Sequence, residues 1–262
     1  MSEEMADVRA IVFKGRIDSS TLRECVEAVL AVVDEARLKI GEEAWKVRAV
    51  DPANVALVDL ELGKEAFSEF SLGPEKERKG EEKEFVVGVP FDKLREVLRW
   101  CKDEVALSIE EDKMTVETSA YTFTLNLLSA DAVRKEPKIP SLNFSTKVAM
   151  DAAEFNKVLK AAEKISDMMA IGVQNEKFFV GVEGDMETMR FSQHKKELMH
   201  LSGGDCRSLF SLEYLTAMSK VAAGASSLTL HLGTDYPLKM EFEIAEGFGK
   251  VIYLLAPRIE AE

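Results

Sequence analysis

Apolar residues recur along this chain at two spacings, one helical and one alternating. The helical spacing of three to four residues covers 21–33, 91–101, 152–165 and 211–222, and predicts four amphipathic helices. Asp18, Ser19 and Ser20 supply capping residues in front of the first of them. Alternating or short apolar runs predict strands at 8–13, 36–40, 44–50, 55–62, 85–89, 105–109, 113–119, 121–128, 144–150, 169–173, 177–182, 188–192, 197–201, 228–232, 238–244 and 249–255.

The order of these segments indicates an α+β fold. The strands are too numerous and too closely joined for parallel crossover connections, which need a dozen or more residues each. Antiparallel sheets with a few helices packed on one side fit the pattern.

The two halves of the chain resemble each other. An offset of 133 residues aligns Leu22 with Phe155 and keeps the apolar positions of both segments in step. A second offset of 121 residues aligns Phe91 with Leu212. These matches predict one unit, a helix followed by strands, that is used four times.

A connector separates the halves at 129–143. Pro137 and Pro140 remove backbone donors and favour extended geometry, so neither a helix nor a central strand is expected there. We therefore predict an N-terminal domain at 1–128, an extended surface connector and a C-terminal domain at 144–262.

Composition fits a globular protein with a highly charged surface. The 262 residues are 46% hydrophobic and 31% charged, with a net charge of −13. Taken alone, this acidity argues against a nucleic-acid partner. Cys25, Cys101 and Cys206 lie far apart, which favours a reducing interior over a disulfide framework. Neither a membrane-spanning run nor a signal peptide is expected, residues 1–7 are expected to be a frayed extension, and 74–84 a solvated loop.

Candidate catalytic residues are few. His194, His200 and Cys206 are near one another in sequence, and a Cys/His nucleophilic pair would make the protein a hydrolase. A hairpin turn with incidental histidines explains the same residues. With three histidines and no paired cysteines, neither a metal site nor a cofactor is expected.

The predicted helices carry basic stripes. Each stripe places three cations on one helix face, and the residues are Arg95, Arg99 and Lys102 on the second helix and Lys157, Lys160 and Lys164 on the third. Such stripes are often plain solvated faces. Alternatively, they neutralise phosphates without reading bases.

Several motifs resemble those of the proliferating cell nuclear antigen family of DNA sliding clamps, and of its archaeal members in particular. They are VDPANVALVDL at 50–60, KIP at 138–140, DYPL at 235–238 and LAPRIE at 255–260. The resemblance covers residues 8 to 260, and it implies a non-enzymatic ring of three subunits, each with two similar domains. Sheets would form the outside of the ring, and two helices of each domain would line the channel.

The resemblance also implies partners and sites. The ring would encircle double-stranded DNA and tether DNA polymerase, clamp loader, flap endonuclease and DNA ligase through a short motif with a glutamine and an aromatic plug. The implied DNA-facing residues are Arg23, Arg95, Arg99, Lys157, Lys160, Lys164 and Lys220, and the stripe on the second helix adds Lys102. The implied partner pocket consists of Val50, Asn54, Val55, Leu57, Ile139, Pro237, Leu254, Ala256 and Pro257. Subunits would pair edge strands near 118–125 and 177–185, through Thr118, Tyr121, Phe123, Leu125, Lys177, Phe179 and Gly181.

Three alternatives remain at this point: a homotrimeric clamp, one subunit of a heterotrimeric clamp, or the hydrolase. The clamp interpretation implies a cytoplasmic, nucleoid-associated protein if the source is archaeal, and a nuclear one if it is eukaryotic. It implies no membrane partner.

Overall fold

The computed structural model describes residues 11–73, 84–110, 112–139 and 141–259. The expected extension at 1–7 and the charged loop, up to residue 83, lie outside the described residues. Within the described part, no helix is long and apolar enough to span a bilayer.

Four helices form where helical spacing predicts them. They are α1 (Ser19–Leu30), α2 (Phe91–Leu98), α3 (Ala152–Ala162) and α4 (Leu212–Ala222). Asp18 and Asp151 cap α1 and α3, because each carboxylate accepts a 2.7 Å hydrogen bond from a backbone N–H of the first turn. The helices are paired, α1 with α2 and α3 with α4, and α1 contacts α4 where the two pairs meet.

The strands form three antiparallel sheets. The central nine-stranded sheet has the order β14 (His200–Gly203), β10 (Thr146–Met150), β16 (Leu228–Leu232), β17 (Leu238–Ile244), β18 (Gly249–Leu255), β4 (Ala56–Gly63), β3 (Ala44–Val50), β2 (Glu35–Ile40) and β6 (Phe85–Pro90). The five-stranded sheet is β5 (Phe67–Leu72), β1 (Phe13–Asp18), β7 (Glu104–Ile109), β8 (Lys113–Glu117) and β9 (Thr122–Asn126). The four-stranded sheet is β13 (Thr188–His194), β12 (Lys177–Glu183), β11 (Met168–Gln174) and β15 (Cys206–Ser211).

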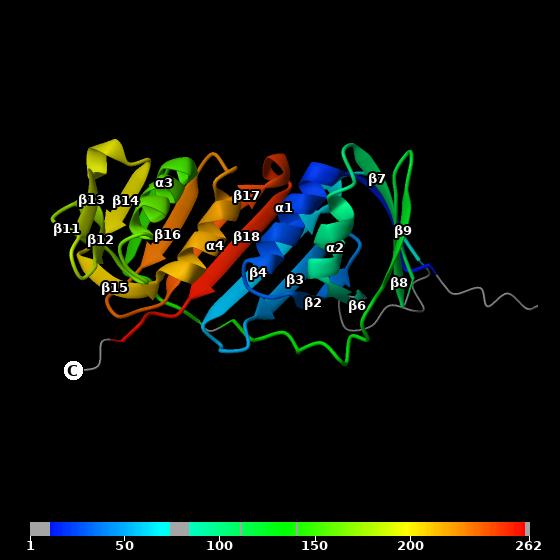
Figure 1. The fold of residues 1–262 in the computed structure, drawn as a ribbon, viewed down its shortest axis with the longest axis horizontal. Coiled ribbons are helices and arrows are strands. Elements are labelled where there is room, and N and C mark those ends of the chain that lie inside the picture. Colours follow the sequence, from blue (N-terminus) through cyan, green and yellow to red (C-terminus); the bar gives the residue numbers. More distant parts are fainter. Residues whose placement is uncertain (1–10, 74–83, 111, 140, 260–262) are drawn as a thin grey trace, which may run out of the picture.

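All four helices cover the same face of the central sheet (Figure 1). The five-stranded sheet stands at one end of the molecule and the four-stranded sheet at the other, as Figure 1 also shows. The connector runs between them past the strand ends of the central sheet (Figure 1). Its described residues form neither a helix nor a strand.

The last strand joins the two halves of the chain. β18 pairs with β4 over seven residues, from Gly249 opposite Leu62 to Leu255 opposite Ala56. Tyr253 of β18 is fully buried, and its hydroxyl donates a 2.8 Å hydrogen bond to the carbonyl of Ala28 in α1. Burial raises the pKa of this phenol, which therefore remains protonated. The sheet and its core are thus continuous across the halves.

The internal repeat is visible in the elements. An offset of 133 carries β1, α1, β2 and β3 onto β10, α3, β11 and β12, and an offset of 121 carries β6 and α2 onto β15 and α4. The predicted repetition of helix and strands therefore corresponds to real structural units.

Two strands were missing from the sequence prediction and two were displaced. β5 was missed because a bulge in its pairing with β1 breaks the alternation, leaving Phe67 and Phe70 three residues apart. β15 was missed because Ser208 occupies a core position, where its hydroxyl bonds to Gly233 and Tyr236. Residues 8–10 of the strand expected at 8–13 lie outside the described residues, and among the described ones the strand begins at Phe13. The strand expected at 197–201 begins at 200 because a 3-10 turn occupies 195–197.

Candidate functional site

An apolar row crosses the sheet face that lies away from the helices. Val50 of β3 is opposite Leu57 of β4, and Leu57 is opposite Leu254 of β18. Leu57 and Leu254 are buried but lie outside the main hydrophobic core. Their chain neighbours Val58 and Tyr253 point the other way and belong to that core. Three residues of the implied pocket therefore form one continuous strip on the outer face.

The chain end borders this strip. The backbone N–H of Ala256 donates a 2.8 Å hydrogen bond to the carbonyl of Val55, and that of Arg258 donates a 2.6 Å bond to Leu209 of β15. Pro257 between them is half-buried, as is Pro237 in the loop before β17. Ile139 of the connector has 39% of its surface exposed, so its side chain is available to a partner.

Asp51 organises the turn between β3 and β4. Its carboxylate accepts hydrogen bonds from the backbone N–H groups of Val55 (2.7 Å) and Ala56 (2.8 Å) and from the hydroxyl of Tyr214 (2.8 Å). Burial would raise the pKa of Asp51, but these donors outweigh it and the pKa is lowered. The same bond to Asp51 raises the pKa of Tyr214. The turn is therefore held by an ionised carboxylate.

Arg134 attaches the connector to this turn. Its guanidinium donates to the carbonyl of Asp51 (2.8 Å) and to Oδ1 of Asn54 (2.6 Å). Asn54 has a φ of 58°, a conformation that asparagine tolerates better than most residues. Asp51, Arg134 and Tyr214 were not anticipated as site residues. Asp51 and Pro52 were noted only as part of the motif at 50–60.

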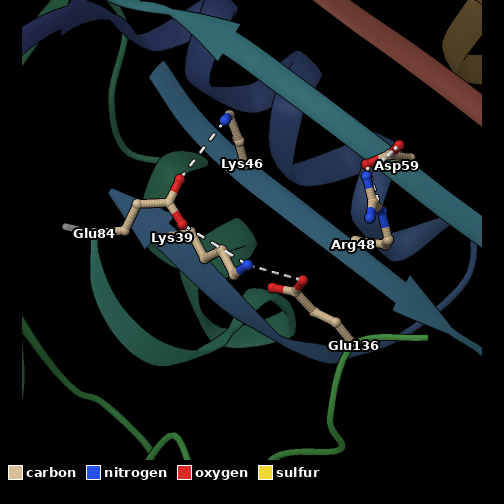
Figure 2. Close-up of polar contacts among 6 residues, drawn as sticks. All are labelled: Lys39, Lys46, Arg48, Asp59, Glu84 and Glu136. Carbon is tan, nitrogen blue, oxygen red and sulfur yellow. Dashed lines mark hydrogen bonds and ion pairs between the residues drawn. The ribbon is translucent and has the colours of Figure 1, made fainter. Parts of the chain in front are cut away.

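Two more contacts fix the first half of the connector to the outer face. Arg37 of β2 donates to the carbonyl of Val133 (3.1 Å), and Lys39 forms a 3.0 Å ion pair with Glu136. Figure 2 shows Lys39 between Glu136 and Glu84. The second half, from 137 to 142, makes no side-chain hydrogen bond or ion pair among its described residues, and Ile139 is in that half. The connector thus presents Ile139 on a segment that is anchored mainly upstream.

The basic residues expected to face DNA fall into two groups. The exposed ones are Arg99, Lys102, Lys157, Lys160, Lys164 and Lys220, whereas Arg23 and Arg95 are half-buried. Arg23 of α1 donates hydrogen bonds of 2.9 and 3.0 Å to the carbonyls of Leu98 and Cys101. These are carbonyls at the C-terminal end of α2, so Arg23 serves as a cap for that helix.

The strand order of the four-stranded sheet shows that one of the two expected edge strands is wrong. Residues 177–185 were expected to contribute an edge, but β12 lies between β11 and β13 and pairs with both, so Lys177, Phe179 and Gly181 are on an interior strand. The edge of that sheet is β13. The physical signal was present, because 178–180 is a continuous apolar run, as interior strands favour, whereas β13 alternates.

The other expected edge agrees with the structure. β9, with Phe123 and Leu125, is the last strand of the five-stranded sheet, and Tyr121 immediately precedes it. Thr118 lies in the turn before β9, where its side chain bonds to the backbone of Tyr121. Trp100 is 63% exposed, with its ring centroid 6.3 Å from that of Tyr121.

The residues of the hydrolase alternative have separate partners. Cys206 is buried in β15, His200 bonds to Ser202 (2.9 Å), and His194 accepts a hydrogen bond from the backbone N–H of Lys196. The structure does not bring them together as a nucleophile and base.

Comparison with known proteins identifies the family. The model of the proliferating cell nuclear antigen N-terminal domain matches residues 13–135, and the model of its C-terminal domain matches residues 138–258. The chain belongs to the proliferating cell nuclear antigen family of DNA polymerase sliding clamps.

Relatives and solved structures agree along nearly the whole chain. DNA polymerase sliding clamps of Methanocella arvoryzae and Methanococcoides burtonii are 40% and 37% identical to it, each over 96% of this chain and 100% of their own length. A structure of the C-terminal region of FEN-1 bound to Archaeoglobus fulgidus PCNA superposes with a TM-score of 0.87 at 37% identity, covering 95% of this chain and 100% of that one. PCNA from Thermococcus kodakaraensis superposes at 0.82 with 25% identity, covering 94% and 100%. The two-domain α+β fold of proliferating cell nuclear antigen is therefore that of this chain.

Proposed function

We propose that three copies of this chain close into a ring that encircles duplex DNA and slides along it. The supporting observation is the distribution of charge. In a chain of net charge −13, exposed cations lie on or directly after α2, α3 and α4, three of the four helices that share one face of the central sheet. If that face lines a channel, these cations meet phosphates, while the acidic remainder keeps DNA off the outer surface.

Free strand edges at both ends of the molecule support the ring. Within the described residues, β9 and β13 each have a strand partner on one side only, and they belong to sheets at opposite ends. Two different edges that pair head to tail generate a closed ring when the rotation fits. Exposed Trp100 and Tyr121 beside β9 add the aromatic surface that interfaces favour. We assign the subunit contact to β9 of one copy and β13 of the next.

We further propose that partner proteins bind at the strip of Val50, Leu57 and Leu254, between Ile139 of the connector and Pro257 of the tail. An aromatic plug would cover the apolar strip, and the peptide backbone would run beside the connector or the tail. DNA polymerase, clamp loader, flap endonuclease and DNA ligase are the proposed partners. This function needs no catalysis by the chain itself and places it with the DNA of the cell, in the cytoplasm of an archaeon.

The decisive experiment tests topology. Light scattering should give the mass of three subunits for the isolated chain. Protein loaded on nicked circular DNA by a clamp loader should be retained through gel filtration and released when the circle is cut once. Protein that stays bound to the linear product would contradict encirclement. An isolated chain that remains monomeric at micromolar concentrations and becomes a trimer only with a second chain would favour the heterotrimer.

A further inference from the structure

We propose that Ser208 of β15 is a positioning residue of the partner pocket. Ser208 does not line the pocket, but it fixes two of its borders. One border is the loop at 233–237, which carries Pro237, and the other is the end of the connector downstream of Ile139. This inference rests on the proposed function, and it names a residue that acts on the bound peptide only through others.

The side chain of Ser208 lies in the core and bonds to one loop. The residue is 1% exposed. Its hydroxyl donates a 2.8 Å hydrogen bond to the carbonyl of Gly233 and lies 3.2 Å from that of Tyr236. It also accepts a 3.0 Å bond from the backbone N–H of Tyr236. A buried hydroxyl is costly unless it is hydrogen-bonded, and here the loop at 233–237 supplies the partners.

These bonds hold the loop in an unusual shape. Asp235 has a φ of 49°, a conformation that is uncommon outside glycine. At Gly233 a side chain would not fit, because a Cβ there would lie 2.8 Å from the Cβ of Tyr236. Ser208 bonds to the residues on both sides of this bend. Pro237 directly follows Tyr236, so the same bonds determine where this border of the pocket lies.

Tyr236 extends the contact to the connector. Its hydroxyl accepts a 3.2 Å hydrogen bond from the backbone N–H of Asn143, and its ring packs edge-on against Phe144, with 5.7 Å between the centroids. Asn143 directly follows the half of the connector that contains Ile139. Tyr236 therefore fixes the downstream end of that half, and Ser208 fixes Tyr236.

The same strand holds the tail. The carbonyl of Arg207 accepts a 3.1 Å hydrogen bond from the backbone N–H of Asp235 in the loop. The carbonyl of Leu209 accepts a 2.6 Å bond from the backbone N–H of Arg258 in the tail. Three consecutive residues of β15 thus hold the loop and the tail beside the apolar strip. Of these three, only Ser208 does so with its side chain, so a substitution can test its role.

Two matched serine variants test the inference. Ser208→Ala removes the hydroxyl that holds the loop. Ser219→Ala is the control, because Ser219 of α4 is also fully buried and its hydroxyl accepts a 3.1 Å hydrogen bond from the side chain of Asn156 in α3. Each variant removes one buried hydroxyl that has a partner, so a general loss of stability affects both. Calorimetry measures the affinity for a synthetic peptide with a glutamine and an aromatic plug, and circular dichroism and trimer mass check folding.

Ser208→Ala should weaken peptide binding about fivefold, because the peptide must then order the loop and the connector end as it binds. Ser219→Ala should weaken it by less than about twofold. Tyr236→Phe keeps the ring and removes only the bond to Asn143, and should cost about threefold. With ¹⁵N-asparagine labelling, the amide resonance of Asn143 should shift in Ser208→Ala and stay in place in Ser219→Ala.

Unchanged peptide affinity in Ser208→Ala, or an equal loss in Ser219→Ala, would overturn the inference. An Asn143 resonance that does not respond to Ser208→Ala would overturn the link to the connector. If Ser208→Ala does not fold, Tyr236→Phe decides, and unchanged affinity in that variant overturns the inference. Failure of the proposed function looks different, because the unmodified protein would then not bind the peptide at all.

Discussion

The hydroxyl of Tyr214 in α4 donates a 2.8 Å hydrogen bond to Oδ2 of Asp51, which lies 163 residues earlier in the turn between β3 and β4. The bond joins a helix of the second half of the chain to the turn that borders the proposed peptide pocket. Arg134 of the connector binds the backbone carbonyl of the same residue, so Asp51 joins the turn, the connector and α4. The shape of the pocket therefore depends on both halves.

Removing the two partners of this bond should have unequal effects. Asp51→Ala leaves the N–H groups of Ala53, Val55 and Ala56 without their acceptor and should lower the free energy of unfolding by about 3 kcal/mol. Tyr214→Phe removes one donor and should cost about 1 kcal/mol. Urea unfolding at one fixed protein concentration measures both, because subunit association contributes to stability. Equal costs would show that the carboxylate does not hold the turn.

The peptide pocket is tested by the double variant Ile139→Ala, Pro257→Ala. Loss of apolar contact on both sides of the strip should weaken a peptide with a glutamine and an aromatic plug about tenfold, near 1.4 kcal/mol. Calorimetry measures the affinity, and the trimer mass should not change. Ile259→Ala is the control, since Ile259 is 87% exposed at the end of the tail. A double variant that binds as tightly as the control would place the pocket elsewhere.

The subunit contact is tested with carboxylates on the free edges. Thr124→Asp on β9 and Ser192→Asp on β13 both replace exposed residues, so each chain should fold. A charge buried in the contact should shift the light-scattering mass from three subunits towards one at micromolar concentrations. Ser71→Asp on β5, another edge strand, is the control and should remain trimeric. A trimer that tolerates both edge variants contradicts the assignment of β9 and β13.

Arg23 should matter for stability more than for DNA. Arg23→Gln shortens the side chain and removes its charge, weakening the hydrogen bonds to Leu98 and Cys101 at the end of α2. The free energy of unfolding should fall by about 1–2 kcal/mol, and duplex affinity by about twofold or less. Chemical unfolding and DNA titration at low salt distinguish the two effects. A loss of duplex affinity of about tenfold would place Arg23 on the channel surface.

Glu241 should contribute to acid sensitivity. Burial opposes its ionisation, but Lys239 and Lys250, both at 2.7 Å, lower its pKa from 4.5 to about 2. A carboxyl whose folded pKa is depressed stabilises the protein above its unfolded pKa and loses that contribution as pH falls. Stability should therefore decline between about pH 4.5 and 2, and less steeply in Glu241→Gln. Glu243→Gln, exposed on the same strand, is the control for thermal melts across this range.

The internal repeat carries information about strand positions that the alternation of apolar and polar residues does not. Shifting β6 by 121 residues gives the bounds of β15, so that missing strand was implied by a segment already predicted. Shifting the observed β14 back by 133 gives the start of β5. The alternation of apolar and polar residues did not predict β15, because the polar Ser208 lies in the core, where its hydroxyl donates a hydrogen bond to the carbonyl of Gly233. It failed at β5 because the bulge opposite Arg16 and Ile17 shifts the inward positions by one residue.

By itself, the sequence determined the four helices, most strands, the α+β class and the family, because spacing, caps and local motifs are properties of neighbouring residues. Tertiary structure decided which strands are edges, that β18 closes onto β4, and that Arg23 caps α2. It also decided that Asp51 meets Tyr214. These are contacts between residues far apart along the chain, and a side chain's partner there depends on how whole elements pack. A basic side chain that helical spacing places among exposed cations can therefore be engaged in hydrogen bonds within the folded protein.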